Sequence, residues 1–368
     1  MSRTAVATIH LAALRANLAR IRDLAREARV MAVIKADGYG HGLERVARAL
    51  AGADAFGVAA IADGQRLRAA GHRQRMVVLS GPDEPADLAE MRRLKLDAVI
   101  HHDAQLAWLE ADRDARPLGV WLKIDTGMHR LGFAPRDAIA AHARLAALAS
   151  VDRDIVLMTH FASSDEFDNA ATAEQIASFE AVAAQLPGAR CLSNSAGVLG
   201  WPAARGDWVR TGGLLYGLSV VDGKSGDDFG FAPAMTLSTR LIAINRVARG
   251  ERIGYAGTWT APDDMPVGVV AIGYGDGYPR SAASGTPVVV GDRTARVVGR
   301  VSMDLVTVDL RDAPDAAVGD RVVLWGRGLP VETVASHAGT IAYDLTCGMT
   351  RRVLFVEDDS LTPRDAND

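Results

Sequence analysis

Eight short apolar runs alternate with longer alanine-rich segments from about residue 11 to residue 217. The segments between them, such as GLERVARALAGA, carry apolar residues at helical spacing. This alternation indicates an α/β fold with a parallel sheet covered by helices, and eight repeats predict a TIM-type (β/α)8 barrel, which we place at residues 11–231. An open doubly wound sheet is the alternative, but no G-x-G-x-x-G motif opens the first helix. The runs are VMAVIK (30–35), AFGVAAI (55–61), RMVVLS (75–80), LDAVIH (96–101), LGVWLKID (118–125), DIVLMTH (154–160), ARCLSNS (189–195) and DWVRTGG (207–213).

The pattern changes after about residue 232, where helix-like segments nearly vanish. Short β-branched runs replace them, and turn signals such as Gly291-Asp292 separate these runs. We therefore predict a mainly β C-terminal domain at residues 232–368, which the strand-like segment 1–10 joins. The runs are GVVAIGYG, TPVVVG, ARVVGRVS, LVTVDL and RVVLWG.

The charge balance and the cysteine content narrow the class of protein. A net charge of -4 over 368 residues implies no basic face, so we expect neither nucleic acid nor a membrane as partner. The two cysteines, Cys191 and Cys347, lie far apart without metal-ligand spacing, which fits a reducing compartment and predicts no metal site. The N-terminus lacks a secretory apolar region, and no apolar run approaches a membrane span. We expect a cytoplasmic protein.

Lysine is scarce in this chain, since only four of the 41 basic residues are lysine. Two of the four, Lys35 and Lys123, stand at the ends of apolar runs. Arginine cannot replace lysine where the chemistry needs an amine that can lose its proton. A lysine at the end of a strand can also be an ion-pair partner whose amine reaches out to water, and this feature alone leaves both interpretations open.

Further chemistry-bearing residues follow the same strand ends, where barrels of this kind collect their functional groups. The loops after strands seven and eight often bind phosphate, and here they offer serine hydroxyls and glycines that let backbone N–H groups approach an anion. A phosphate site together with an isolated lysine suggests pyridoxal phosphate held as a Schiff base. A plain tight turn is the alternative interpretation of the glycines. The residues are Tyr39, His41, Lys123, Asp125, Arg130, His160, Ser193, Asn194, Ser195, Arg210, Thr211, Gly212 and Gly213.

Motifs along the whole chain resemble those of the alanine racemase family. AVIKADGYGHG resembles the family's pyridoxal-phosphate attachment signature, and the resemblance continues in order through LKIDTGMHRLG, THFASSDE, SNSAG, VRTGGLLYG, IGYAGTW, GYGDGYPR, GRVSMD and IAYDLTC. The resemblance implies pyridoxal 5'-phosphate as the cofactor and Lys35 as its Schiff-base lysine and a catalytic base. It implies Tyr255 as the second base, and a head-to-tail homodimer in which this tyrosine reaches the site of the other subunit.

The resemblance also assigns supporting roles. Two bases on opposite faces are the direct way to remove an α-proton from one face and return it on the other. A phenol acts as a base only beside positive charge or hydrogen-bond donors, which His160 and Arg210 are candidates to supply. Lys123 matches a lysine that is often carbamylated in the family. The carbamylated lysine then orients the arginine that matches Arg130. The implied cofactor-binding residues are Lys35, Tyr39, His160, Asn194, Ser195, Arg210, Gly212, Gly213 and Tyr343, and the implied substrate-binding residues are Arg130, Met303 and Tyr274.

The function that this resemblance implies is an isomerase that interconverts L-alanine and D-alanine and supplies D-alanine for peptidoglycan. A broader-specificity amino-acid racemase is an alternative, because the difference lies in the volume of the pocket. A decarboxylase of basic amino acids would favour a carboxylate at the pyridine nitrogen and a cysteine in the pocket. The resemblance implies Arg210 at the pyridine nitrogen, and Ser302 stands where many members carry cysteine, so both residues disfavour a decarboxylase. A non-catalytic pyridoxal-phosphate carrier protein would lack the β domain and Tyr255. His41 receives no role.

Overall fold

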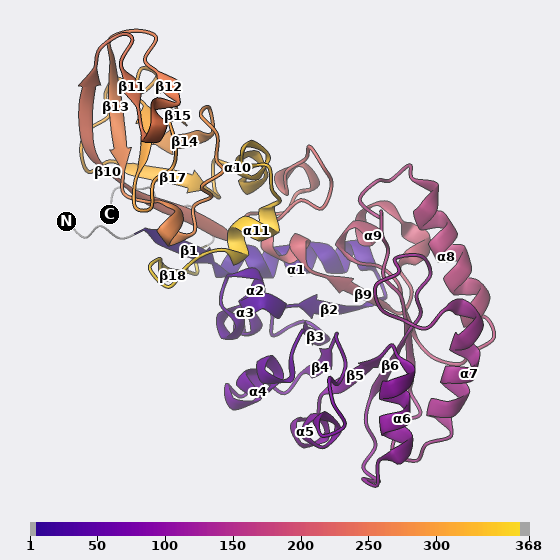
Figure 1. Cartoon of the computed structure of the whole chain (residues 1–368). Coiled ribbons are helices and arrows are strands. Elements are labelled where there is room, and N and C mark those ends of the chain that lie inside the picture. The colour runs from indigo at the N-terminus through magenta and orange to yellow at the C-terminus, as the bar shows by residue number, and fades with distance from the viewer. Residues whose placement is uncertain (1–4, 361–368) are drawn as a thin grey trace.

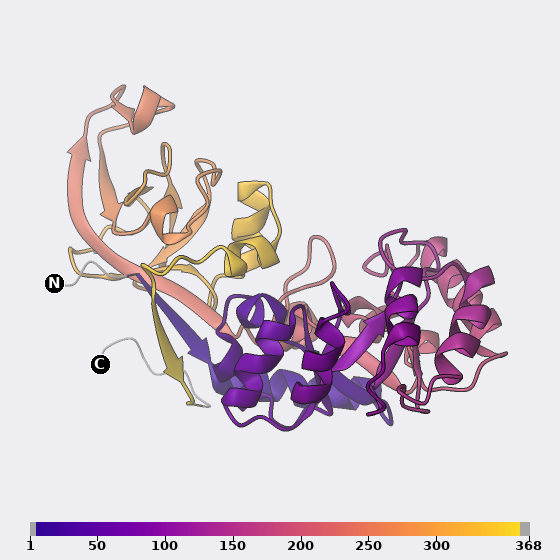
Figure 2. The same ribbon diagram turned by 60° about the horizontal axis from the view of Figure 1, so that its bottom comes forward.

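A computed structural model describes residues 5–360, which form a barrel and a β domain (Figure 1). The long strand β10 (Met235–Val247) runs from the barrel into the β domain (Figure 2). Of the domain ranges predicted from the sequence, residues 1–4 and 361–368 lie outside the described part. No helix within 5–360 is long and apolar enough to cross a membrane.

Eight parallel strands close into a barrel, and the predicted TIM-type fold is confirmed. Each strand pairs with the next one along the chain, and β2 pairs with β9 to close the ring. Each predicted apolar run overlaps one strand, because side chains that are buried on both faces of a parallel strand must be apolar. The strands are β2 (Arg29–Val33), β3 (Ala55–Val58), β4 (Arg75–Val78), β5 (Asp97–Ile100), β6 (Val120–Lys123), β7 (Val156–Met158), β8 (Arg190–Cys191) and β9 (Trp208–Thr211).

Helices follow the strands and cover the outside of the barrel (Figure 1). Helix α7 is an example. It begins with Pro135, whose missing N–H is tolerated there because the first N–H groups of a helix are unpaired in any case. Its residues Ala138, Ala141 and Leu145 form a buried stripe at helical spacing, which faces the barrel. The helices are α1 (Leu11–Ala25), α2 (Lys35–Tyr39), α3 (Leu43–Ala49), α4 (Ile61–Ala69), α5 (Asp87–Leu94), α6 (Asp103–Ala111), α7 (Pro135–Ala146), α8 (Ala170–Ala183) and α9 (Ser195–Gly200).

The inside of the barrel is packed. Trp121 and Trp208 meet edge to face at 5.3 Å between ring centroids and are both fully buried. The guanidinium of Arg75 lies over both rings, and Asp97 pairs with it and accepts the indole N–H of Trp121 at 2.9 Å. Because Arg75, Asp97 and Trp208 begin their strands, this cluster fills the amino end, and a ligand can enter only at the carboxyl end.

The C-terminal domain is built on an antiparallel ring. Strand β10 pairs with β13 on one side and β17 on the other, and β16, β15 and β14 complete the ring. Strand β1 pairs with β10, and β18 pairs with β1, so the start of the chain contributes to this sheet. The remaining strands are β1 (Val6–His10), β11 (Arg252–Ile253), β12 (Trp259–Thr260), β13 (Met265–Val270), β14 (Pro287–Val290), β15 (Arg293–Val297), β16 (Val306–Asp309), β17 (Arg321–Trp325) and β18 (Leu354–Asp358).

Two short helices of the C-terminal domain, α10 (Val331–Ala338) and α11 (Ala342–Cys347), lie on the side that faces the barrel (Figures 1 and 2). Helix α11 touches the turn after Lys35 so closely that a Cβ atom on Gly40 would lie 2.0 Å from the carbonyl oxygen of Thr346. Only glycine permits this approach. The contact places Tyr343, which lies on α11, beside the carboxyl end of the barrel.

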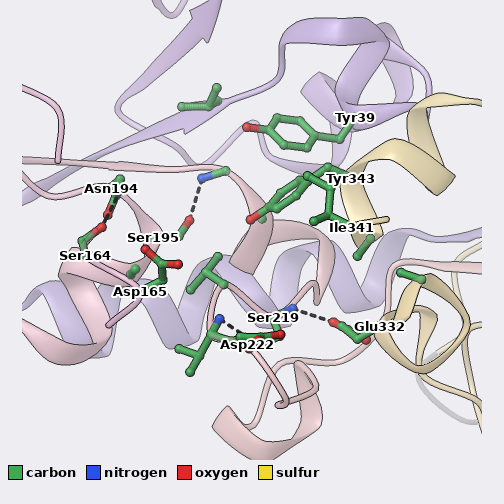
Figure 3. Close-up of a pocket in the computed structure, with 18 of the residues that line it drawn as sticks. Tyr39, Ser164, Asp165, Asn194, Ser195, Ser219, Asp222, Glu332, Ile341 and Tyr343 are labelled. Carbon is green, nitrogen blue, oxygen red and sulfur yellow. Dashed lines mark hydrogen bonds between the residues drawn. The ribbon is translucent and has the colours of Figure 1, made fainter. Parts of the chain in front are cut away.

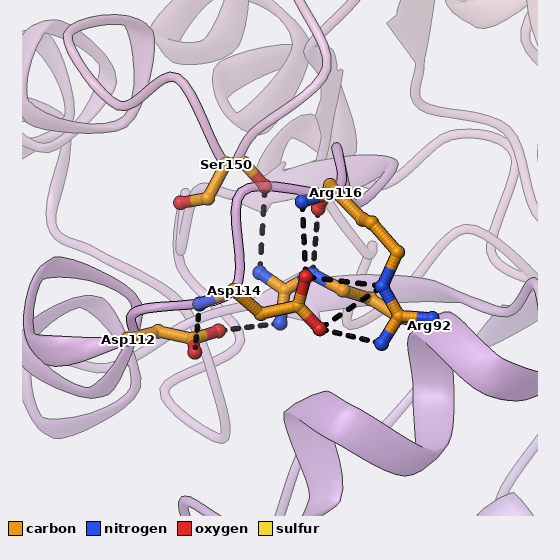
Figure 4. A network of polar contacts seen from close by, with 5 residues as sticks. All are labelled: Arg92, Asp112, Asp114, Arg116 and Ser150. Atoms are coloured by element: carbon orange, nitrogen blue, oxygen red, sulfur yellow. Dashed lines mark hydrogen bonds and ion pairs between the residues drawn. The ribbon is translucent and has the colours of Figure 1, made fainter.

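A polar network ties the amino ends of β6 and β7 together (Figure 4). The buried Arg92 side chain, on α5, forms an ion pair with Asp112 and donates to the carbonyl of Arg116 at 2.7 Å and to that of Ser150 at 3.5 Å. The Ser150 carbonyl also accepts the N–H of Leu118 at 2.9 Å. The network therefore fixes the register of two strands whose other ends carry Lys123 and the residues next to His160.

Replacing Arg92 should destabilise the barrel. We expect Arg92→Ala to lower the free energy of unfolding by about 3–5 kcal/mol, because it leaves the partly buried Asp112 carboxylate without its counter-ion and the Arg116 carbonyl without its donor. Urea unfolding followed by far-UV circular dichroism measures the change. Arg93→Ala is the matched control, since Arg93 is the next residue and its pair with Glu90 is solvent-exposed, so its midpoint should stay near that of the parent. Equal midpoints for the two variants would contradict the role of Arg92.

Candidate active site

Lys35 follows strand β2 and begins a backbone turn of unusual hand. Residues 36–40 all have positive φ, from 52° at Ala36 to 78° at Gly40. Each non-glycine residue in this conformation costs about 1–2 kcal/mol, so Ala36, Asp37 and Tyr39 are strained. Strain of this kind persists only where the surroundings enforce it, and it is concentrated at functional sites. The turn carries Lys35 and Tyr39 into the same space.

That space is a cavity of about 1870 Å³ at the carboxyl end of the barrel, between the barrel loops and α10 and α11. It brings together residues of strands β2, β6, β7 and β9 and of the loop after β8 with residues of the C-terminal domain. The predicted site residues that line it are Lys35, Tyr39, Lys123, Arg130, His160, Asn194, Ser195, Arg210, Gly212, Gly213 and Tyr343.

Two tyrosines and two glycines form a small cup on one wall of the cavity. Tyr39 and Tyr343 lie side by side with their hydroxyls pointing toward Ser195, whose Oγ accepts the N–H of Gly212 at 2.9 Å (Figure 3). A Cβ atom on Gly212 would lie 2.4 Å from the Tyr39 hydroxyl, and one on Gly213 would lie 2.3 Å from that of Tyr343. These positions need glycine so that both hydroxyls can approach the backbone.

Burial keeps both phenols protonated. It raises the pKa of Tyr39 to about 12, with Cys347 adding to the effect, and it raises the pKa of Tyr343 as well. Both hydroxyls are therefore hydrogen-bond donors over the whole physiological range. The hydroxyls of Tyr39, Tyr343 and Ser195, gathered beside the backbone of two glycines, suit the oxygens of a phosphate group. Asn194 acts behind the cup: its carboxamide accepts the N–H of Gly197 at 2.8 Å and bonds to Ser164, which holds the loop that presents Ser195 (Figure 3).

Arg210 is a buried cation at the base of the cavity. Its guanidinium donates to the Thr159 carbonyl at 3.0 Å, to the Cys191 sulfur at 3.2 Å and to Nδ1 of His160 at 2.9 Å. All three acceptors are neutral, and no carboxylate within residues 5–360 forms an ion pair with this arginine. The guanidinium is thus held in place with part of its charge unbalanced, and it lines the cavity.

His160 is kept neutral by this arrangement. Its Nδ1 accepts a hydrogen bond from Arg210, so the ring carries its proton on Nε2. Burial, together with the charge of Arg210, lowers the pKa of His160 well below its usual value. The sequence suggested that His160 could supply either positive charge or a hydrogen-bond donor to a phenol. Because its ring is neutral, it can supply only the N–H donor.

Positive charge is concentrated in the part of the cavity where the barrel strands end, although the lining also includes the acidic residues Asp165, Glu166, Asp222, Asp228 and Glu332. Desolvation in the cavity lowers the pKa of Lys35, and the charges of Arg130 and Arg210 lower it further. Burial, then Arg210 and Arg130, lower the pKa of Lys123 to about 8, although Asp125 opposes this. Lys35, Lys123 and the two arginines favour an anionic ligand at the strand ends, and these two lysines lose their protons more easily than free lysine does.

Three predicted site residues do not line this cavity. Tyr255, Met303 and Tyr274 lie in the C-terminal domain and are 69%, 53% and 39% exposed. Strand β11, which Tyr255 closely follows, lies at the end of the C-terminal domain away from the barrel (Figure 1). Within the described part of one chain, these side chains are therefore surface residues.

Sequence reasoning missed the partners of the site residues. No sequence pattern indicated that Cys191 and the Thr159 carbonyl hold Arg210, or that Tyr216 stacks on Tyr39 at 4.7 Å between ring centroids. The inward alternation of strand residues was the available signal for Cys191, which lies in the barrel interior. That alternation does not tell which inward residues of different strands meet.

A closed (β/α)8 barrel that gathers lysines, arginines and a phosphate-sized cup at its carboxyl end defines a barrel enzyme that handles an anionic, phosphate-bearing molecule. Residues 9–220 match the family model described as "Alanine racemase, N-terminal domain", and residues 234–356 match "Alanine racemase, C-terminal domain". The chain belongs to the alanine racemase family.

Individual relatives agree with the family models over nearly the whole chain. An alanine racemase of Shewanella loihica is 53% identical over 342 residues, which are 93% of this chain and 95% of that protein. One of Halorhodospira halophila is 50% identical over 355 residues, 96% of this chain and 97% of that protein. The crystal structure of the biosynthetic alanine racemase of Pseudomonas aeruginosa superposes with a TM-score of 0.94 at 43% identity, covering 97% of this chain and all of that one.

The lowered pKa of Lys123 generates a prediction about its chemistry. A neutral amine can attack CO₂, forming an N–C bond and a carbamate while its proton goes to solvent. With a pKa of about 8, the neutral fraction of Lys123 rises from about pH 6 to about pH 9, so we expect carbamate to increase over this interval at a fixed concentration of dissolved CO₂. Carbon-13 NMR with labelled bicarbonate measures it, and Lys123→Arg is the control. A spectrum without a carbamate signal that depends on Lys123 would contradict this expectation.

Proposed function

We propose that this protein interconverts L-alanine and D-alanine with pyridoxal 5'-phosphate as its cofactor. One observation carries the proposal: the Lys35 amine and the phosphate-sized cup open into the same cavity at the carboxyl end of the barrel. An amine and an anion cup are the two features that an aldehyde bearing a phosphate requires. Relatives that share about half of the sequence over nearly the full length are described as alanine racemases, which supports the choice of reaction.

The residues present fit pyridoxal phosphate. Tyr39, Ser195 and Tyr343 would hold its phosphate, with Gly212 and Gly213 leaving the necessary room. Arg210 would face the pyridine nitrogen, and since an arginine does not give up its proton, it would donate a hydrogen bond without protonating the ring. Lys35 would hold the cofactor covalently until the amino group of the substrate replaces it, and the cofactor, once joined to the substrate, would supply the electron withdrawal that makes the α-proton acidic.

Lys35 is the base that we assign to one face of the substrate. The desolvated cavity and its arginines lower the pKa of this amine, so that the neutral form needed to accept a proton becomes accessible. The flexible side chain of lysine can release the cofactor and remain beside the α-carbon, where Nζ takes up the proton or returns it. The positive wall that Arg130 forms would hold the substrate carboxylate.

The other face needs a second base, and we propose Tyr255 from a second copy of this chain. Its exposure on the C-terminal domain, away from the cavity of its own chain, supports a role in a neighbouring site. Met303 and Tyr274, also exposed, would line the substrate pocket of that same neighbour. His160 and Arg210 would then offer N–H donors to the incoming phenol.

A shared site makes oligomeric state and activity inseparable. We therefore expect the protein to sediment as a dimer at every concentration at which it racemises alanine. Sedimentation velocity in parallel with activity over a dilution series measures both. Full activity at a dilution where only monomer sediments would contradict the contribution of Tyr255 from a second chain.

Racemisation of alanine by the purified protein tests the proposed function. We expect the parent to show the yellow visible absorbance of bound pyridoxal phosphate and to convert either enantiomer of alanine to the mixture, with larger amino acids reacting more slowly. Lys35→Ala and Lys35→Arg should lose both the absorbance and the activity, because neither side chain can bind the cofactor covalently.

Lys95→Arg is the control, since Lys95 ends α5 outside the cavity and should be dispensable. Comparable rates over a panel of larger amino acids would favour the broader-specificity racemase instead. Bound cofactor without any racemisation would favour the carrier protein. Unchanged absorbance in Lys35→Ala would contradict the assignment of the lysine.

A further inference from the structure

His41 follows Lys35 in the same motif, yet its side chain does not line the cavity. Its side chain is fully buried behind the left-handed turn. Nδ1 lies 2.8 Å from the carbonyl oxygen of Tyr39 and 3.1 Å from that of Gly38. Because both neighbours are acceptors, Nδ1 carries the proton and donates it to the turn.

The other ring nitrogen makes this histidine costly. Nε2 is buried and has no hydrogen-bond partner among residues 5–360. A buried polar atom without a hydrogen-bond partner is unfavourable, and an apolar ring would fill the same space without that cost. Burial also lowers the pKa of His41 to about 4, so the ring is neutral and does not act as an acid or base near neutral pH. What the imidazole adds over a phenyl ring is the Nδ1–H donor.

The His41 ring also supports Tyr39 through a third residue. It packs against Tyr216 at 4.7 Å between ring centroids, and Tyr216 in turn stacks on Tyr39, also at 4.7 Å. The Tyr216 hydroxyl donates to the carbonyl of Val33, at the end of strand β2, at 3.1 Å. Since Tyr216 closely follows Gly212 and Gly213, this aromatic group joins the Lys35 turn to the cup.

We propose that His41 is a positioning residue, which holds the strained turn so that Lys35 and Tyr39 are already in place when the phosphate-bearing cofactor arrives. The proposal rests on the proposed function for the identity of that cofactor. Without the donor, the left-handed residues are free to relax toward ordinary backbone conformations, and the lysine and the tyrosine lose their fixed separation. Binding then has to order the turn, which weakens it.

Three substitutions separate the donor from the ring. His41→Asn places an amide N–H near the position of Nδ1, His41→Gln places it near the position of Nε2, and His41→Phe keeps a ring without a donor. His142→Asn is the matched control, because His142 is also buried but lies on α7, outside the cavity. Circular dichroism melts establish that each protein is folded.

The readouts are the dissociation constant of pyridoxal phosphate for the cofactor-free full-length protein and the hydrogen exchange of amides 36–42. We expect His41→Phe and His41→Gln to weaken binding about tenfold, the loss that one hydrogen bond predicts, and to speed exchange in this segment. His41→Asn should remain within about threefold of the parent, and His142→Asn should match the parent.

Parent-like binding and exchange in both His41→Gln and His41→Phe would overturn the proposal. So would equal weakening in all four variants, which would mean general destabilisation. If His41→Phe fails to fold, the contrast between His41→Asn and His41→Gln decides the question alone. A parent that binds pyridoxal phosphate but does not racemise alanine would instead count against the proposed function and leave the role of His41 standing.

Discussion

Positive charge gathers where the barrel strands end, and the rest of the site depends on it. Arg210 is buried against neutral acceptors, and Lys35, Lys123 and Arg130 line the same cavity. Like charges in a partly dry space destabilise one another, so an anion that enters is stabilised and the chain gains stability from binding it. Burial, and after it the same repulsion, lowers the pKa of both lysines, which makes them reactive. One electrostatic arrangement thus selects the ligand and activates the amine.

The C-terminal domain belongs to this site as much as the barrel does. Helix α11 lies against the turn at Gly40 and brings Tyr343 next to Tyr39, so a barrel alone would lack one of the two tyrosines of the cup. The opposite end of the same domain carries Tyr255 on the surface, where it is 69% exposed. A domain that completes the site of its own chain at one end and presents a phenol at the other suits an enzyme whose sites are shared.

Much of the molecule could be predicted from its sequence because strand burial and strand ends leave clear patterns. The eight apolar runs predicted the barrel, and most of the motif residues from Lys35 to Arg210 line one cavity, although His41, Asp125 and Ser193 do not. What could not be predicted depends on three-dimensional contact. No local pattern shows that Cys191 accepts from Arg210, or that residues 36–40 are left-handed. The pairing of β10 with β13 closes the second ring, and no local sequence pattern shows which strands pair there.

The central claim is that Lys35 and Tyr255 act on one substrate from two chains, and subunit exchange tests it most directly. Inactive Lys35→Ala and Tyr255→Phe proteins are mixed in equal amounts, dissociated mildly and allowed to reassociate with pyridoxal phosphate. Random pairing makes half of the dimers mixed, and each mixed dimer has one intact site of two, so about a quarter of the parent activity should return. A mixture that forms mixed dimers yet stays as inactive as its components would contradict the claim.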